Sequence, residues 1–298
     1  MDSTVLNNLR SRSIPKLGDA PNYSRIKVDV SDNRIEEPLI DIRNLNISGS
    51  NYYNSYWNPP YHHTAPYSIS DLFVRKEVAN KLIAINSKLR QTGLELHIWD
   101  AYRPIALQNY FFRVWMPDFF ERQHPEKGID WAKKETAKFW APGATDIGSI
   151  LLYPPPHGTG GAIDLTIRVI NGFIIEMGGL FDDLCDRSRS DFFELTPPTN
   201  FTENEAQKNR RILYNVMVDE GFVPHPLEWW HFSYGDRLWA ATTGIRSFYS
   251  YANIENLDLH VDRHSITCHE ALGKRCIILN SLSHGECGTG QPVNQPDS

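Results

Sequence analysis

Two short segments that lie far apart in the chain constrain its fold more than any other feature. The first is His157-Gly-Thr-Gly-Gly-Ala-Ile-Asp164, and the second is Glu228-Trp-Trp-His231. Two imidazoles and one carboxylate form the protein ligands of many catalytic zinc sites, which keep a fourth position for water. A fold that uses this set must bring the two segments side by side, and Glu228 then becomes a spare carboxylate beside the site.

This constellation indicates hydrolytic chemistry. We predict that His157, Asp164 and His231 bind one Zn²⁺ per chain, which would lower the pKa of a bound water towards ~7 and polarise a carbonyl group. Glu228 is the predicted general base. Arg103 follows a predicted strand and precedes a proline, so it could stabilise an oxyanion, an effect on the order of 3 kcal/mol. Each residue alone is more often structural, and only their joint occurrence favours catalysis.

The first half of the chain carries one clear helix and one clear strand. Apolar spacing predicts a core helix that starts at an N-cap, Ser70, and ends before Gly93. Alternation then predicts a strand over residues 94–99. Residues 25–30 are also strand-like. The aromatic run 51–63 is either a loop over a pocket mouth or a plain surface loop.

The first motif leads into a predicted strand over residues 162–169, with Asp164 on the face opposite its apolar side chains. Asn171-Gly172 is typical of a type I′ hairpin turn, so residues 173–177 should return as a second strand. These patterns place the aspartate on a sheet.

The second motif follows a predicted helix. Thr202-Glu-Asn-Glu205 resembles a capping box, and the helix should end at Gly221. Residues 222–234 then read as one strand. On a regular strand Glu228 and His231 would face opposite sides, so the strand must twist, bulge or end near the two tryptophans between them.

Composition limits the classes of partner and compartment. The 298 residues include 30 Lys+Arg and 36 Asp+Glu, a net charge of −6, and no basic block, which argues against nucleic-acid binding. The N-terminus lacks the apolar region of a signal peptide, and no apolar run approaches the ~20 residues that span a bilayer. We therefore expect a cytoplasmic protein that acts on a small molecule, away from membranes. The four cysteines are expected to be reduced thiols, and a homo-oligomer stays open.

Taken together, the motifs resemble the VanX-type D-alanyl-D-alanine dipeptidases, a zinc D,D-peptidase group related to D-Ala-D-Ala carboxypeptidases and the hedgehog domain. The likeness spans about residues 40 to 250 of this sequence. The segments that carry it are His157-x-x-Gly160-x-Ala162-x-Asp164, Glu228-x-x-His231, Trp99-Asp-Ala-Tyr-Arg-Pro104, Met177-Gly-Gly-Leu-Phe-Asp182 and Gly235-Asp-Arg-Leu-Trp-Ala240.

The resemblance implies an α+β fold, in which a small antiparallel sheet carries the zinc site and helices pack on it. Residues 40–250 would form the dipeptidase domain, with residues 1–39 as an N-terminal extension and 251–298 as a C-terminal extension of unknown role. Histidines and cysteines in the last segment could form a second metal site, although their irregular spacing argues against it.

The resemblance also implies roles for individual residues. By this resemblance His157, Asp164 and His231 bind zinc. Glu228 is the catalytic base, and Arg103 stabilises the transition state. Asp182 is placed near the free amino group of the substrate. One position departs from the family pattern, because Pro155 stands where a serine usually helps to hold that amine. Proline has neither a hydroxyl nor an N–H group, so amine recognition would have to be relocated.

The expected function is zinc-dependent hydrolysis of D-Ala-D-Ala or a similar free D,D-dipeptide. One rival is a D,D- or L,D-carboxypeptidase or endopeptidase that acts on peptidoglycan stem peptides, although such an enzyme would need export. Another is a non-catalytic, zinc-stabilised binding domain. Glu228 argues against the second rival, because a structural zinc site needs no base and fills all four positions with protein ligands.

Overall fold

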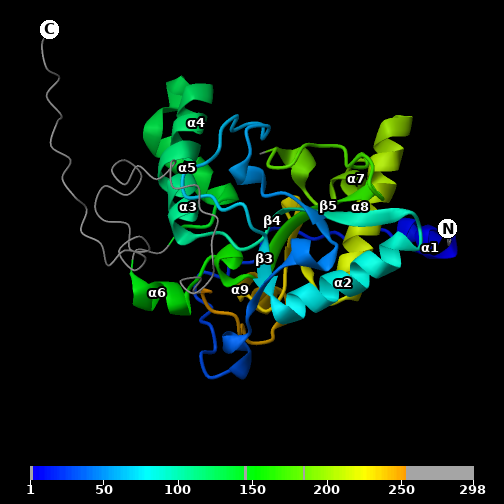
Figure 1. Ribbon diagram of the computed structural model, residues 1–298. Coiled ribbons are helices and arrows are strands. Elements are labelled where there is room, and N and C mark those ends of the chain that lie inside the picture. Colours follow the sequence, from blue (N-terminus) through cyan, green and yellow to red (C-terminus); the bar gives the residue numbers. More distant parts are fainter. Residues whose placement is uncertain (1–2, 144–145, 184, 253–298) are drawn as a thin grey trace, which may run out of the picture.

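A five-stranded sheet forms the centre of the computed structural model, which describes residues 3–143, 146–183 and 185–252 (Figure 1). In spatial order its strands are β2 (Ser48–Gly49), β4 (Leu94–Asp100), β5 (Ala162–Val169), β7 (Glu228–Ser233) and β6 (Val223–His225). All neighbours are antiparallel except β2 and β4. A second, two-stranded sheet pairs β1 (Leu39–Asp41) with β3 (Phe73–Arg75).

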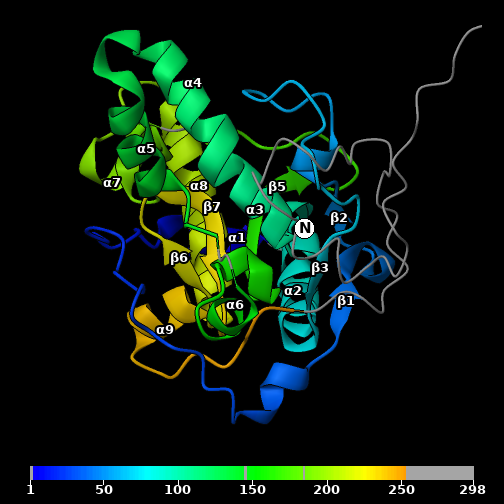
Figure 2. The same cartoon turned by 90° about the vertical axis from the view of Figure 1, so that its left-hand side faces the viewer.

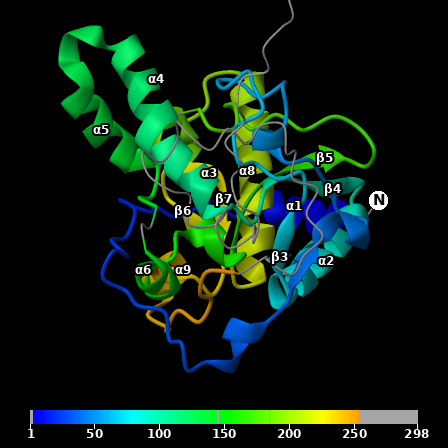
Figure 3. The same cartoon turned by 60° about the vertical axis from the view of Figure 1, so that its left-hand side comes forward.

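Helices surround the larger sheet and give the predicted α+β architecture. Their bounds are α1 Ser3–Ser11, α2 Lys76–Arg90, α3 Ile105–Tyr110, α4 Met116–Gln123, α5 Gly128–Phe139, α6 Ile147–Leu152, α7 Phe192–Leu195, α8 Phe201–Asp219 and α9 Arg237–Thr243. A π-helical segment, Phe111–Trp115, joins α3 to α4. Helices α4 and α5 lie side by side and project away from the sheet (Figures 2 and 3).

The apolar core contains residues from the sheet and from the long helices. Ile163, Leu165 and Ile167 of β5 are fully buried, together with Leu82 of α2 and Met217 of α8. Burial of each such side chain contributes about 1.5–3 kcal/mol. This packing fixes the position of β5, and β5 carries the first motif into the site.

The two strands predicted from strict alternation are confirmed, since β4 and β5 form where residues 94–99 and 162–169 indicated. The predicted N-cap at Ser70 is wrong. Residues 73–75 pair with β1 as strand β3, so helix α2 begins only at Lys76. The apolar side chains before Lys76 fit either a helix or a strand, and tertiary pairing decides between them.

Three other local predictions also need correction. Residues 222–234 form two strands, β6 and β7, joined by a tight turn rather than one strand. Asn171 adopts a positive φ of 53°, but Gly172 does not, so the turn is not type I′, and the returning segment makes only a bridge between Arg168 and Ile174. No strand forms at 25–30, where the chain instead bonds to α6.

The N-terminal segment is fastened along the outside of the larger sheet. Helix α1 packs against α8, and the chain that follows runs past β6 and α9 (Figures 2 and 3). Hydrogen bonds hold this segment at several points: Asn215 Nδ2 to the Arg12 carbonyl, Arg189 Nη2 to the Gly18 carbonyl, Val28 N to the Leu152 carbonyl and Asp29 N to the Ser247 carbonyl. The division at residues 39 and 250 stays a prediction. Most of the C-terminal extension, including its predicted metal ligands, lies outside the described residues.

The cap of α8 gives a test of the local fold. Asn200, not Thr202, is the N-cap, and its Oδ1 accepts a hydrogen bond of 3.0 Å from Glu203 N. We expect Asn200→Ala to lower the free energy of unfolding by about 1 kcal/mol, because an amide N–H loses its partner. Thr202→Ala is the matched control, with a change within about 0.5 kcal/mol. Urea unfolding measures both, and a larger loss in the Thr202 variant would contradict the assignment.

Candidate metal centre and active site

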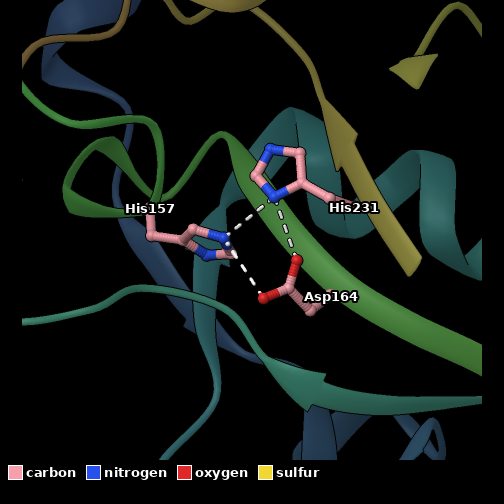
Figure 4. A group of neighbouring side chains, drawn as sticks. All are labelled: His157, Asp164 and His231. Atoms are coloured by element: carbon pink, nitrogen blue, oxygen red, sulfur yellow. Dashed lines mark hydrogen bonds and ion pairs between the residues drawn. The ribbon is translucent and has the colours of Figure 1, made fainter. Parts of the chain in front are cut away.

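The register of the sheet brings the two sequence motifs together. Asp164 near the start of β5 lies opposite His231 of β7 on one side and opposite Asp100 of β4 on the other. His157 comes from a short 3-10 turn, Pro156–Thr159, immediately before β5. Figure 4 shows the three predicted ligands pointing toward one another from this turn and the two strands.

The three predicted ligands form a compact, buried donor group. His157 Nε2 lies 3.1 Å from His231 Nδ1 and 3.3 Å from Asp164 Oδ2, and His231 Nδ1 lies 3.0 Å from Asp164 Oδ1. Tetrahedral zinc with bonds of ~2.0–2.1 Å separates its donor atoms by roughly 3.4 Å. The residues therefore fit a zinc ion in both chemistry and spacing.

Neighbouring groups orient both imidazoles. His157 Nδ1 lies 2.8 Å from the Ala101 carbonyl, a distance at which this nitrogen donates and leaves Nε2 free to face the other ligands. His231 Nε2 lies 3.2 Å from Ser233 Oγ, which leaves its Nδ1 facing Asp164. Such outer contacts are typical of metal-binding histidines, because they fix the tautomer and the ring orientation.

The charge of Asp164 is stabilised by its neighbours. Burial alone would raise the pKa of this carboxyl group, but the positive charge of His157 and the hydrogen bonds from both histidines outweigh burial and lower that pKa strongly. Arg103 adds a further cation, with Nη2 3.5 Å from Asp164 Oδ2. An ionised carboxylate is the form that binds a metal.

Glu228 is the first residue of β7, directly after the turn from β6. The strand register is irregular there, so the side chain of Glu228 does not have to point away from the face that carries His231. Its Oε2 lies 3.8 Å from His231 Nδ1. Burial raises the pKa of Glu228 to about 8, and the charge of His231 opposes this rise. A cation bound nearby would lower that pKa again.

Arg103 is held rigidly at the edge of the same site. Its Nε donates to Asp100 Oδ2 at 2.9 Å, and its Nη1 donates to Gln108 Oε1 at 2.9 Å. The guanidinium carbon lies 4.4 Å from the centre of the Trp140 ring and 4.9 Å from that of Tyr53. These contacts fix the direction of a buried positive charge.

Asp182 lies beside two tyrosines from the aromatic loop. Its Oδ2 accepts hydrogen bonds from Tyr53 Oη at 2.7 Å and from Tyr61 Oη at 2.8 Å. Burial, together with the charge of Asp164, raises its pKa to about 6. Asp182 also has a positive φ of 56°, which non-glycine residues rarely adopt and which is often found at functional sites.

All six predicted site residues line one cavity of about 60 Å³, and Pro155 lines it as well. The sequence left residues 51–63 open as either a loop over a pocket mouth or a plain surface loop, and Tyr53 of this run lies in the cavity wall, which favours the first alternative. Other lining residues were not predicted, because no sequence motif marks them and only the fold brings them to the cavity. They are Tyr23, Gln108, Phe139, Trp140, Ala141, His225 and Leu238.

Comparison with known proteins agrees with this geometry. A family model described as Peptidase_M15, D-ala-D-ala dipeptidase, matches residues 61–251, which is most of the chain and includes all six site residues. The chain belongs to this family. The resemblance drawn from the motifs is therefore confirmed at the level of the family.

Several relatives carry the name D-alanyl-D-alanine dipeptidase. The protein from Synechocystis is 34% identical over 157 residues, covering 49% of this chain and 62% of the relative. The Escherichia coli protein is 32% identical over 168 residues, covering 56% and 69%, and the Enterococcus faecium protein is 29% identical over 171 residues, covering 56% and 75%. The match thus spans less than two thirds of the Synechocystis protein.

Other predictions from the sequence receive narrower support. Within the described parts of this M15 family member, no helix is both long enough and apolar enough to cross a membrane. Cys185 is a free, exposed thiol, and the other three cysteines lie outside the described residues. The cytoplasmic location, the lack of nucleic-acid binding and the oligomeric state stay predictions.

The donor group predicts how zinc content responds to mutation. We expect about one zinc per chain in the purified protein and its loss in His231→Ala, because two ligands hold zinc far more weakly than three. His225→Ala is the matched control, since this neighbouring ring lies 5.6 Å from that of His231 and is not in the donor group. Elemental analysis measures both, and full zinc in the His231 variant would show that the ligand set is wrong.

Proposed function

We propose that the protein is a zinc-dependent dipeptidase that hydrolyses D-Ala-D-Ala or a similar small D,D-dipeptide with both termini free. The observation that carries this proposal is the convergence of a metal-type donor group, a buried acid and a fixed guanidinium on one small cavity. The names of the relatives support the choice of D-Ala-D-Ala and of D configuration.

The reaction divides between the donor group and Glu228. A zinc ion held by His157, Asp164 and His231 would supply a Lewis acid and lower the pKa of the attacking water. Glu228 takes a proton from this water and returns it to the nitrogen of the leaving residue, which breaks the peptide bond without releasing an amide anion. Its carboxylate lies 3.8 Å from the His231 ring, so it reaches the same reacting atoms.

Arg103 stabilises the negative charge that develops on the peptide oxygen. Asp100, Gln108 and the aromatic rings fix its direction before substrate arrives, so little reorganisation is needed in the transition state. The guanidinium cannot act as a proton donor at neutral pH, which leaves acid–base work to Glu228.

Asp182 binds the free ammonium group of the substrate. Pro155 lines the cavity but offers no donor or hydroxyl, so the family's serine contact has no counterpart at that position. Tyr53 and Tyr61 both donate to Asp182 and hold its carboxylate in place. Amine recognition in this chain therefore depends on Asp182 and the two phenols.

The base is tested by Glu228→Gln, which keeps size and hydrogen bonding but removes the proton acceptor. We expect kcat for D-Ala-D-Ala to fall by about 10²–10⁴-fold while zinc content is unchanged. Alanine release and elemental analysis measure the two quantities on one preparation. Unchanged hydrolysis with zinc retained would contradict the catalytic assignment and favour a binding domain.

Amine recognition is tested by Asp182→Asn, which removes the negative charge. We expect kcat/KM for D-Ala-D-Ala to fall by about 10–100-fold, in line with the loss of a buried charge-assisted hydrogen bond. The matched comparison is N-acetyl-D-Ala-D-Ala, which has no ammonium group and should be a poor substrate for both proteins. If Asp182→Asn lowered kcat/KM by the same factor for both peptides, a specific role of Asp182 at the amino group would be excluded.

A panel of peptides separates the proposal from the rival peptidases. We expect hydrolysis of D,D-dipeptides and little hydrolysis of L,L-dipeptides or of a stem-like tripeptide blocked at its amino end. A preference for the blocked tripeptide would instead identify a carboxypeptidase.

A further inference from the structure

Tyr23 contributes to the active-site wall although it lies outside residues 61–251, the part that matches the family model. It belongs to the N-terminal segment and lines the same cavity as Glu228, His231 and Leu238. This chain therefore brings a residue into its site from a segment that the family match does not contain.

The segment that carries Tyr23 is anchored on both sides of it. Before Tyr23, Arg189 Nη2 donates to the Gly18 carbonyl at 2.9 Å. After it, Val28 N donates to the Leu152 carbonyl at 3.1 Å, and a turn is closed by Ile26 N and the Tyr23 carbonyl at 3.1 Å. A ring on such a doubly anchored loop acts as a fixed wall.

The ring of Tyr23 also packs against a buried cation. The guanidinium carbon of Arg237 lies 5.1 Å from the centre of the Tyr23 ring and 5.6 Å from that of Tyr153. Arg237 is only 7% exposed and forms no ion pair with a carboxylate among the described residues. Cation–π contact stabilises a desolvated guanidinium by up to about 2 kcal/mol, so Arg237 holds the ring in position.

The neighbours of Tyr23 indicate which end of the cavity it closes. Tyr23 packs on Arg237, the residue before Leu238 in the cavity wall. Asp182 belongs to a different group of contacts: it accepts hydrogen bonds from Tyr53 and Tyr61, and Arg103 Nη2 lies 3.2 Å from Tyr53 Oη. In the proposed reaction Asp182 holds the amino end of the substrate, so Tyr23, which is outside this group, is placed on the side of the leaving residue.

We propose that Tyr23 closes the cavity beyond the leaving residue and thereby restricts the protein to peptides that end there. A peptide with a further residue on its carboxyl end would clash with this ring. The inference rests on the proposed dipeptidase function for the identity of the substrate. The closure of the cavity by Tyr23 does not depend on that function and can be measured without catalysis.

The size test compares D-Ala-D-Ala, D-Ala-D-Ala-Gly and Gly-D-Ala-D-Ala in the full-length protein and in Tyr23→Leu, which removes the ring and keeps an apolar side chain. We expect kcat/KM for D-Ala-D-Ala-Gly, relative to D-Ala-D-Ala, to rise at least about tenfold, with no such rise for Gly-D-Ala-D-Ala. No rise, or an equal rise for both extended peptides, would overturn the assignment.

Two further variants separate the ring from its surroundings. Tyr153→Leu removes the other ring beside Arg237 but does not open the cavity, since Tyr153 is not in its lining, so the size preference should stay as in the native protein. Tyr23→Phe keeps the ring and should also keep the size preference. If either variant accepted D-Ala-D-Ala-Gly as well as Tyr23→Leu does, the ring would not be the barrier.

Access to the cavity is measured independently by diethyl pyrocarbonate labelling of His225, a lining residue whose side chain is 14% exposed. Mass spectrometry should show faster labelling of His225 in Tyr23→Leu and unchanged labelling of His124, which is 46% exposed. Unchanged labelling of His225 would overturn closure by Tyr23. A protein that hydrolyses none of the peptides but shows the faster labelling would refute the proposed function and leave the closure standing.

Discussion

The Asp164 carboxylate lies buried within the sheet, 3.0 Å from His231 Nδ1, 3.3 Å from His157 Nε2 and 3.5 Å from Arg103 Nη2. A buried charge is tolerated only when partners compensate the loss of water. The register of β5 supplies one partner directly, because it sets Asp164 opposite His231 of β7. On the other side it sets Asp164 opposite Asp100 of β4, which accepts a hydrogen bond from Arg103 and so holds that cation nearby. A slip of one residue would turn Asp164 to the other face and separate the whole group.

Segments outside the sheet complete the wall of the cavity around this donor group. The aromatic loop brings Tyr53 to both Asp182 and Arg103, the chain after α5 brings Trp140 over the same guanidinium, and the N-terminal segment adds Tyr23. The charged side chains that line this cavity are largely buried, so they interact more strongly than they would at the surface. A cavity of about 60 Å³ favours a small substrate over a polymer.

Secondary structure and site residues are predicted best where a short sequence pattern is compatible with only one local structure. Strict alternation predicts β4 and β5, and the paired motifs predict the three residues that converge as a donor group. Prediction fails where the outcome depends on distant partners: residues 73–75 become a strand only because β1 lies beside them, and β7 begins at Glu228 only because the chain turns back on β6. Tyr23 has no local signal at all, since its role comes from where residues 12–30 are anchored.

The most direct measurement is the position of the metal itself. Anomalous diffraction at the zinc edge from crystals of the full-length protein should show one peak within ~2.0–2.2 Å of His157 Nε2, His231 Nδ1 and an Asp164 carboxylate oxygen. Such a peak would confirm the arrangement on which the proposed function depends. A peak bound by other side chains, with none between these three residues in zinc-saturated crystals, would contradict it.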